Sequence, residues 1–191
     1  MPVQETSGDH HWSRAAVDRF ESPLTLYSAR LLNDAEAARD VVQDAFLRLC
    51  TQDRQRVEPH LAEWLFTVCR NRALDVLRKE RRMSRLQEEQ LSVVPSPMPE
   101  PSADLERREE ASRVLKMLDL LPDHQKEVIR LRFQNGFSYK EISRITGHSV
   151  SNVGYLMHAG MKTLRGRLLS DPSPSAPAPA PAMPRATPSQ A

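Results

Sequence analysis

Residues 69–82, CRNRALDVLRKERR, hold six Lys or Arg among fourteen positions. Positive charge at this density creates a local field to which a polyanion can bind. If the stretch is helical, successive side chains are about 100° apart, so its polar residues share one face. That face consists of Asn71, Asp75, Arg78 and Arg82, widened by Arg70, Lys79 and Arg81. Cys69, Ala73, Val76 and Leu77 form an apolar face for burial. A basic face can also be merely solvated, so it needs a second indication.

The second indication is the segment SYKEISRITGHSVSNVGYLMHAGM at 138–161, whose spacing is typical of a DNA-binding helix-turn-helix. Ile142 and Ile145 are the apolar positions of a first short helix, and Gly147 permits a left-handed turn. Either Ser149 or Ser151 can cap the second helix. The predicted buried stripe of that second helix is Val150, Val153 and Met157.

The opposite side of this second helix carries side chains that can read or hold DNA. Asn can pair with adenine through two hydrogen bonds, and Ser, Tyr, His and Lys can donate to bases or phosphates. The predicted reading face is Ser151, Asn152, Tyr155, His158 and Lys162. The alternative is a solvated face of a small helical bundle.

Amphipathic helices are expected to position both the basic face within residues 69–82 and the reading face of the helix-turn-helix. Aromatic residues make up 5% of the chain, and a strand-like alternation is sustained nowhere, so the predicted fold class is all-α. A first helix is expected to start at Pro23, a second is capped by Asp34, and a third follows Pro59 and contains residues 69–82. Its apolar stripe includes Trp64.

Proline-rich stretches divide the chain into two small helical domains. VVPSPMPEPSAD places four prolines in twelve residues, which predicts a flexible linker, and residues 86–111 hold seven Asp or Glu. The C-terminal Pro/Ala-rich stretch has almost nothing to bury. The expected organisation is a disordered leader (1–14), a first domain (15–83), an acidic linker (84–104), a helix-turn-helix domain (105–169) and a disordered tail (170–191).

Composition excludes several classes of protein and site. No run approaches the roughly 18 apolar residues of a membrane span, and the polar start lacks the apolar region of a secretory signal, so we expect a cytoplasmic protein without membrane insertion. Cys50 and Cys69 lie on apolar helical stretches and are expected to be reduced core thiols. His124, His148 and His158 have no second ligand type at helical spacing, so no metal site is predicted. We also expect neither catalytic residues nor a cofactor.

Three segments together resemble a known family. DAEAARDVVQDAFLRLC (34–50), EWLFTVCRNRALDVLRKERR (63–82) and the stretch from LPDHQKEVIRLRF to KTLRGRL (121–168) are similar, in this order, to parts of bacterial RNA polymerase sigma factors of the extracytoplasmic function type. The resemblance spans about 20–83 and 105–169. It implies a non-catalytic subunit that binds core polymerase, directs it to promoters and assists melting of the minus-ten region.

The resemblance also implies roles for single residues. Side chains of the first segment would dock on the coiled coil of the largest polymerase subunit: Asp40, Gln43, Asp44, Leu47 and Arg48. Side chains of the second would bind minus-ten DNA: Asn71, Arg72, Asp75, Arg78, Lys79 and Arg82. Asn71 matches the position that contacts a flipped base, whereas Trp64 and Phe66 belong to the core. The reading face would contact the minus-thirty-five element. The partners are therefore core polymerase, promoter DNA both double-stranded and melted, and an anti-sigma factor.

The sequence departs from the family pattern in the helix-turn-helix. Ser143 stands where alanine is usual, and Gly154, Tyr155 and Leu156 stand where many relatives carry arginines, so no promoter consensus can be transferred. One alternative is a helix-turn-helix regulator that binds operators without polymerase. A nucleic-acid-processing enzyme is the other, but no paired carboxylates or Gly-rich phosphate loop support it.

Overall fold

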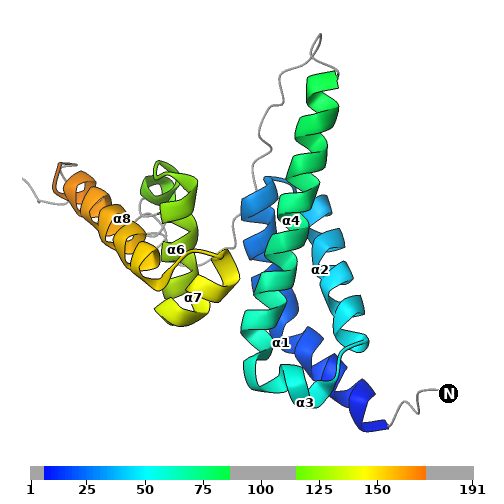
Figure 1. Cartoon of the computed structure of the whole chain (residues 1–191). Coiled ribbons are helices and arrows are strands. Elements are labelled where there is room, and N and C mark those ends of the chain that lie inside the picture. Colours follow the sequence, from blue (N-terminus) through cyan, green and yellow to red (C-terminus); the bar gives the residue numbers. More distant parts are fainter. Residues whose placement is uncertain (1–6, 87–114, 171–191) are drawn as a thin grey trace, which may run out of the picture.

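The computed structural model describes residues 7–86 and 115–170, and all regular structure in these two ranges is helical (Figure 1). The first range forms α1 (Ser7–Leu32), α2 (Ala35–Cys50), α3 (Arg54–Val57), the 3-10 turn η1 (Glu58–His60) and α4 (Leu61–Leu86). The second forms a helical turn at 115–119, α6 (Asp123–Phe133), α7 (Tyr139–Thr146) and α8 (Val150–Ser170). The all-α prediction is confirmed. Most of the predicted linker and the tail from 171 onward lie outside the described residues, and residues 84–86 of that linker belong to α4.

The junction between α1 and α2 follows from two polar residues. Asn33 has a φ of +55°, a left-handed conformation that Asn adopts more readily than most residues, and its N–H bonds to the Ala29 carbonyl at 2.8 Å. Asp34 then accepts hydrogen bonds from the backbone N–H groups of Glu36 and Ala37. The predicted cap is confirmed, and the two helices lie antiparallel after a two-residue connection.

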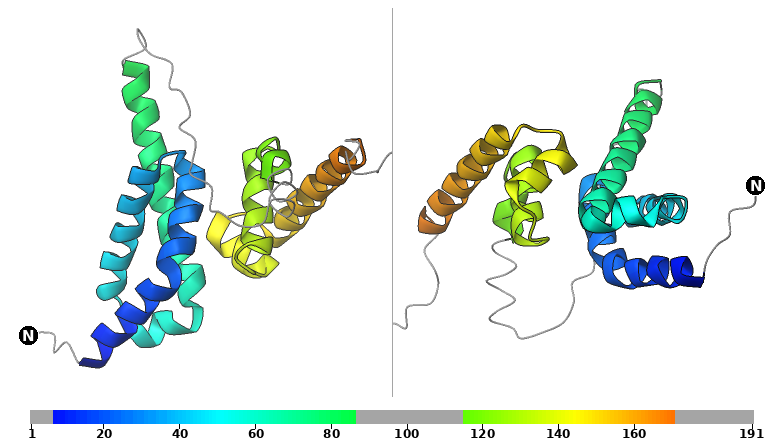
Figure 2. Two further views of the ribbon diagram at one scale, coloured as in Figure 1. Left: turned by 180° about the vertical axis from the view of Figure 1, so that it is seen from behind. Right: turned by 60° about the horizontal axis from the view of Figure 1, so that its bottom comes forward.

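The start of α1 differs from the prediction. The helix begins at Ser7, so Pro23 lies in its interior and residues 7–14 of the predicted disordered leader are helical. An interior proline removes one helix hydrogen bond and commonly kinks the helix, and Figure 2 shows α1 changing direction along its length. The helix persists because Ala16 and Phe20 extend the buried stripe toward the N-terminus, where Trp12 also packs against the core.

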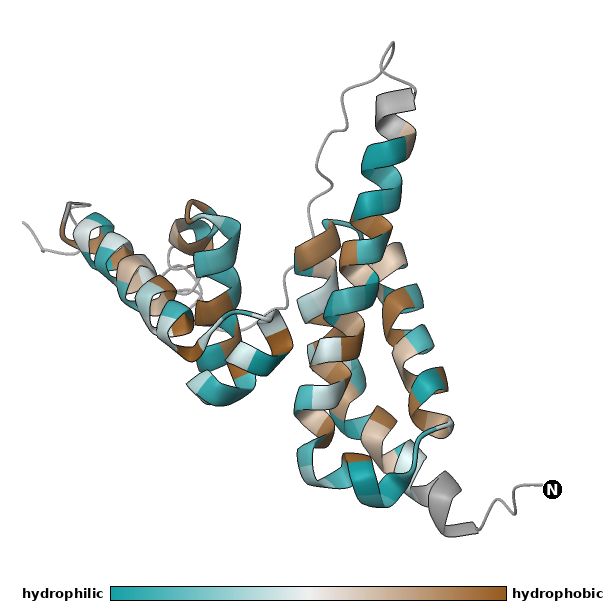
Figure 3. Cartoon of the chain, in the orientation of Figure 1, coloured by the Kyte–Doolittle hydropathy of each residue, from teal (hydrophilic) through white to brown (hydrophobic). Residues whose placement is uncertain are grey.

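The core of the first domain lies where α1, α2 and α4 face one another. Leu24, Ala45 and Leu65 contribute one fully buried side chain from each of the three helices. Figure 3 shows apolar residues along all three helices and mostly hydrophilic residues on the part of α4 that extends beyond the bundle, up to its grey end. No helix in the described ranges is long and apolar enough to cross a membrane.

In the second domain, α6 and α8 approach closely at Gly160. A Cβ added there would lie 2.6 Å from the Cδ1 of Ile129 and 3.4 Å from the Cβ of Gln125. Ile129 is itself only 4% exposed, so its side chain would have to change its packing to make room. Glycine is therefore favoured at this crossing for its lack of a side chain.

We expect Gly160→Ala to lower the free energy of unfolding of the second domain by about 1 kcal/mol. Overpacking costs about 1–3 kcal/mol, and the better helix propensity of Ala returns about 1 kcal/mol of that loss. Gly166→Ala is the matched control on the same helix, because an added Cβ meets no atom within 4 Å there. Thermal unfolding should separate the two variants, with the control slightly stabilised. An equal gain for both would show that α6 can shift.

The two domains touch through α4 and α7 (Figures 1 and 2), and Glu127 in the middle of α6 accepts hydrogen bonds from Tyr27 of α1 and Arg70 of α4. Phe66 of α4 is 2% exposed, and its ring lies between those of Tyr27 and Phe137, with centroid distances of 5.1 and 5.0 Å. Arg144 Nη2 of α7 lies 2.6 Å from Glu63 Oε2 of α4. The interface thus joins an aromatic cluster to an ion pair.

Candidate nucleic-acid interface

The polar face of α4 has the composition and exposure predicted for it. Cys69 and Ala73 are fully buried on one side of the helix. The other side is exposed, and its members are Asn71, Asp75, Arg78, Lys79 and Arg82. Figure 1 shows the C-terminal part of α4 extending beyond α1 and α2, so the basic residues are presented away from the bundle. The helical projection is therefore confirmed for these five residues, but it was wrong for Arg70, which is only 12% exposed because it pairs with Glu127 of α6.

Two ion pairs modify this face. Arg78 Nη1 lies 2.9 Å from Asp75 Oδ1, one turn away on the same helix. Arg72 Nε lies 2.8 Å from Asp44 Oδ2 of α2, with both side chains about two-fifths exposed. Exposed pairs of this kind contribute about 0–1 kcal/mol, so a phosphate can compete for either arginine. Arg72 and Asp44, predicted for different partners, contact each other.

The helix-turn-helix is formed by α7, a short turn and α8. Ser138 caps α7 through a capping box with Glu141, and this hydrogen bonding lowers the pKa of the Glu141 carboxyl. Gly147 ends α7 with a φ of +75°, as predicted, and Ser149 caps α8 by accepting from the Asn152 N–H at 3.2 Å. Ile142 and Ile145 are buried beneath the turn. The left-handed Gly147 and the Ser149 cap therefore fix where α8 begins.

Ser143, the unusual residue of the motif, bonds across the turn. Its Oγ donates to the His148 carbonyl at 2.6 Å, while its own carbonyl accepts from the Gly147 N–H at 2.9 Å. Alanine at this position could make only the second of these bonds. The serine therefore ties the end of α7 to the start of α8 and supports the orientation of the reading helix.

The predicted reading face of α8 is exposed. Its members are Ser151, Asn152, Tyr155, His158 and Lys162, and Tyr155 is 68% exposed. Val153 and Met157 are buried on the opposite side, as predicted, but Val150 is 45% exposed, so its assignment to the buried stripe was wrong. Val150 is the first residue of α8, and neighbouring elements cover a terminal side chain on fewer sides. The reading face is thus separated from the residues that hold the helix in place.

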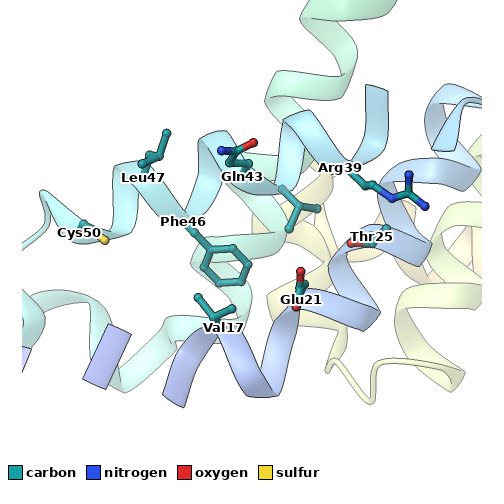
Figure 4. A pocket seen from close by; sticks show the side chains of 9 residues that line it. Val17, Glu21, Thr25, Arg39, Gln43, Phe46, Leu47 and Cys50 are labelled. Carbon is teal, nitrogen blue, oxygen red and sulfur yellow. The ribbon is translucent and has the colours of Figure 1, made fainter. Parts of the chain in front are cut away.

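A groove between α1 and α2 lies beside the predicted polymerase-binding residues. Its volume is about 390 Å³, and Figure 4 shows Phe46 of α2 pointing toward Val17 of α1, with Gln43 and Leu47 at the edge of the groove. Its full lining is Val17, Glu21, Thr25, Arg39, Val42, Gln43, Phe46, Leu47 and Cys50. Leu47 is 61% exposed on an otherwise polar strip, so its apolar surface is available to a partner. Sequence reasoning missed the α1 residues because it began that helix at Pro23.

The five predicted polymerase-binding residues form one strip along α2 that faces two ways. Gln43 and Leu47 line the groove, whereas Asp44 points to Arg72 on α4. Asp40 and Arg48 are exposed and lie on the same strip by helical projection. The strip therefore offers a partner an apolar contact at one edge and charges along the other.

The two cysteines differ in environment. Cys69 is buried, and burial raises the pKa of its thiol to about 12, so the thiol stays protonated at neutral pH. Cys50 is exposed at the end of α2, so the prediction of two core thiols was wrong for this residue. The helix ends there, and the groove leaves its side chain uncovered. The described residues contain no group of three or more His, Cys, Asp or Glu that could hold a metal ion.

Two family models match the chain in the order of its domains. The model described as Sigma-70 region 2 matches residues 16–83, and the model described as Sigma-70, region 4 matches residues 111–164. The first match contains α4 and the groove-forming part of α1 and α2, and the second contains the helix-turn-helix. Both candidate DNA-binding faces therefore fall inside matched regions.

Individual relatives agree with these matches. The chain is 32% identical over 157 residues to the ECF RNA polymerase sigma factor SigL of Mycobacterium tuberculosis, an alignment that covers 80% of this chain and 86% of that protein. It is 26% identical over 157 residues to the probable RNA polymerase sigma factor RfaY of Xanthomonas campestris, of which the chain spans 39%. The crystal structure of the sigma factor RpoE in complex with the anti-sigma factor NepR from Bartonella quintana is similar with a TM-score of 0.63, at 21% identity, over 83% of this chain and 98% of that one. At that identity the likeness concerns the fold.

Proposed function

The chain belongs to the extracytoplasmic function sigma factors of bacterial RNA polymerase, and we propose that its exposed faces divide the work of initiation between core polymerase and two promoter elements. The observation that carries the proposal is the pairing, in one chain, of a projecting basic helix with an exposed helix-turn-helix reading face. A stand-alone operator-binding regulator is not favoured. We further propose that the protein acts in the cytoplasm, where promoters are accessible, and that it performs no chemistry itself.

The polymerase contact is assigned to the strip on α2. An exposed leucine beside a groove, flanked by charged residues, suits a partner helix that places an apolar side chain in the groove and polar ones around it. The coiled coil of the largest polymerase subunit is the partner that the family implies. Leu47 and Gln43 would make the central contact, with Asp40, Asp44 and Arg48 at its rim.

The minus-ten contact is assigned to the exposed face of α4. Opening a duplex costs a few kcal/mol for each extruded base, and a protein can offset that cost by capturing the base and neutralising the displaced backbone. Asn71 would capture the base, and the arginines and lysine toward the end of the helix would hold phosphates. Arg72 would first have to exchange Asp44 for a phosphate.

The minus-thirty-five element is assigned to the second domain, and an anti-sigma factor is assigned to both domains together. The face of α8 with Asn152 and Tyr155 would lie in the major groove of the minus-thirty-five element, with Lys162 on a phosphate. An anti-sigma factor is proposed as the regulatory partner. The support for it is the solved relative, which was crystallised with one.

Reconstituted transcription tests these assignments. The purified protein is mixed with core polymerase and genomic promoter fragments, and promoter-dependent transcripts are expected. Replacing Asn71 with alanine should reduce open complexes, scored by permanganate reactivity of unpaired thymines, by about tenfold, because one base-specific hydrogen bond contributes about 1–2 kcal/mol. Core binding should stay at the parent level.

The matched control is Gln55→Ala, which removes an exposed amide side chain from α3 rather than from α4. It should open promoters as the parent protein does. Failure of the parent to form a stable core complex would refute the proposed polymerase contact. Equal permanganate reactivity for Asn71→Ala and the parent would remove Asn71 from the melting face.

A further inference from the structure

We propose that His124 of α6 is a positioning residue for α8, the reading helix. Its ring contacts the ring of His148, which lies in the turn of the helix-turn-helix, and this contact fixes the direction in which α8 leaves the turn. The ring contact is independent of the proposed function. Only its consequence for promoter selection rests on that function.

The two rings join segments that are distant in the chain. Their centroids lie 5.2 Å apart, and the angle between their planes is 81°. Aromatic rings pack favourably when nearly perpendicular, because the positively polarised edge of one ring faces the negatively polarised face of the other. His124 is the second residue of α6, and His148 lies between Gly147 and the Ser149 cap. The contact therefore connects α6 to the short turn that precedes α8.

A buried ring nitrogen indicates which histidine supplies the edge. Nε2 of His148 is buried and has no hydrogen-bond partner among residues 7–86 and 115–170. A buried polar atom without a partner costs free energy and is uncommon in folded proteins. A ring N–H can, however, point at an aromatic face and form a weak hydrogen bond there. The edge therefore belongs to His148, with the hydrogen on Nε2, and the face belongs to His124.

The backbone of His148 is held by α7 alone. Its carbonyl accepts a hydrogen bond from Ser143 Oγ at 2.6 Å, and its N–H donates to Thr146 Oγ1 at 3.4 Å. Both contacts come from the helix that precedes the turn, so they do not relate the turn to α6. The ring of His124 supplies that second point of attachment.

A small rotation of α8 would be enough to disturb the reading of bases. This helix crosses α6 closely at Gly160, eight residues after Asn152. At about 1.5 Å per residue, Asn152 lies about 12 Å from the crossing, so a rotation of about 10° moves it by about 2 Å. Hydrogen bonds to a base vary in length by only about 0.5 Å. A contact near the start of α8 therefore protects the geometry of the reading face.

Nuclear magnetic resonance of the full-length chain tests the ring contact. In protein with ¹⁵N-labelled histidine, the ring nitrogen shifts show which nitrogen carries hydrogen, and the His148 signals are assigned from the spectrum of His148→Gln. We expect the hydrogen on Nε2 and an upfield shift of the neighbouring ring proton, since it lies over the face of His124. His124→Leu removes the face and should abolish the upfield shift. His124→Phe keeps an aromatic face and should retain it.

Promoter selection tests the positioning role. Binding is measured with core polymerase on the genomic fragment that gives the most transcript, and on a fragment of equal length without promoter activity. His124→Leu should bind the promoter fragment about tenfold more weakly, because a misdirected reading helix loses a base contact. Its binding to the other fragment should stay within about twofold, because phosphate contacts supply that affinity. A general loss of folding would weaken both, and His124→Phe should regain most of the selectivity.

The matched control is His60→Leu, which removes an exposed histidine from η1. It should leave the His148 signals and the promoter selectivity at the parent level. The described residues supply no third ligand for a metal ion beside the two histidines, so EDTA should also leave the spectra unchanged. Each variant has to keep its helical circular dichroism. If His124→Leu does not, His124→Gln, which also lacks a ring, takes its place.

Three results would overturn the ring contact: no upfield shift in the parent, its persistence in His124→Leu, or its loss on addition of EDTA. A ring contact in the parent, with equal selectivity for His124→Leu and the parent, would overturn the positioning role. A parent protein without preference for the promoter fragment would refute the proposed minus-thirty-five contact, and with it the consequence for promoter selection. The spectra decide the ring contact in that case as well.

Discussion

Core polymerase is expected to bind the Leu47→Glu variant at least about 30-fold more weakly than the parent protein. Leu47 is 61% exposed beside the groove between α1 and α2, where an apolar partner side chain would cover it. A carboxylate there would be buried in the complex without a partner, and central interface residues commonly contribute about 2 kcal/mol or more. Because the side chain is exposed in the free protein, folding should be unaffected. Fluorescence anisotropy of the labelled protein titrated with core enzyme gives the affinity.

Leu120→Glu is the matched control for this variant. Leu120 is 65% exposed, so the same chemical change is made at a leucine of similar exposure outside the strip on α2. It should bind core polymerase within about twofold of the parent. Equal binding by both variants would place the polymerase contact elsewhere, whereas equal loss in both would show a general effect of negative charge.

A Leu24→Ala substitution is expected to lower the free energy of unfolding of the first domain by about 3–4 kcal/mol. Leu24 is fully buried between α1 and its neighbours, and truncation of such a leucine combines lost burial with a cavity. A domain of this size is stable by about 5 kcal/mol, so most of its stability would be lost. The melting temperature should fall by about 15 °C or more.

Hydrogen exchange localises this effect. Amides of α2 and α4 should lose protection in Leu24→Ala, while those under the helix-turn-helix retain it. Leu26→Ala is the control, since Leu26 lies two residues away on the same helix and is 37% exposed. Its cost should be below about 1 kcal/mol. A similar loss in both variants would mean that α1 is not held by the buried stripe.

Features set by short-range chemistry were predictable from the sequence. The Asp34 cap, the left-handed Gly147 and the two faces of α4 each depend on residues within one or two turns of one another, whereas for the cap of α8 the sequence left Ser149 and Ser151 as alternatives. Helical spacing and capping preferences therefore identify them without knowledge of the fold. The same reasoning correctly predicted that the residues proposed to bind DNA lie on exposed faces of α4 and α8.

Features set by distant parts of the chain were not predictable. Pro23 is tolerated inside α1 because Ala16 and Phe20, which precede it, pack into the same core as Leu24, and local preference for a helix start ignores such packing. Cys50 lies on an apolar stretch, yet a groove leaves it exposed. Glu127 pairs with residues 57 and 100 positions earlier in the chain. No spacing rule connects such residues.

The separation of the two sides of α8 has a consequence for how such a protein diversifies. Val153, Met157 and Gly160 keep the helix in place, while Asn152 and Tyr155 are exposed and contribute little to folding. Substitutions on the exposed side should therefore be nearly neutral for stability. Over evolutionary time, duplicated copies of the gene could acquire new target promoters by a few such changes without first passing through an unstable ancestor.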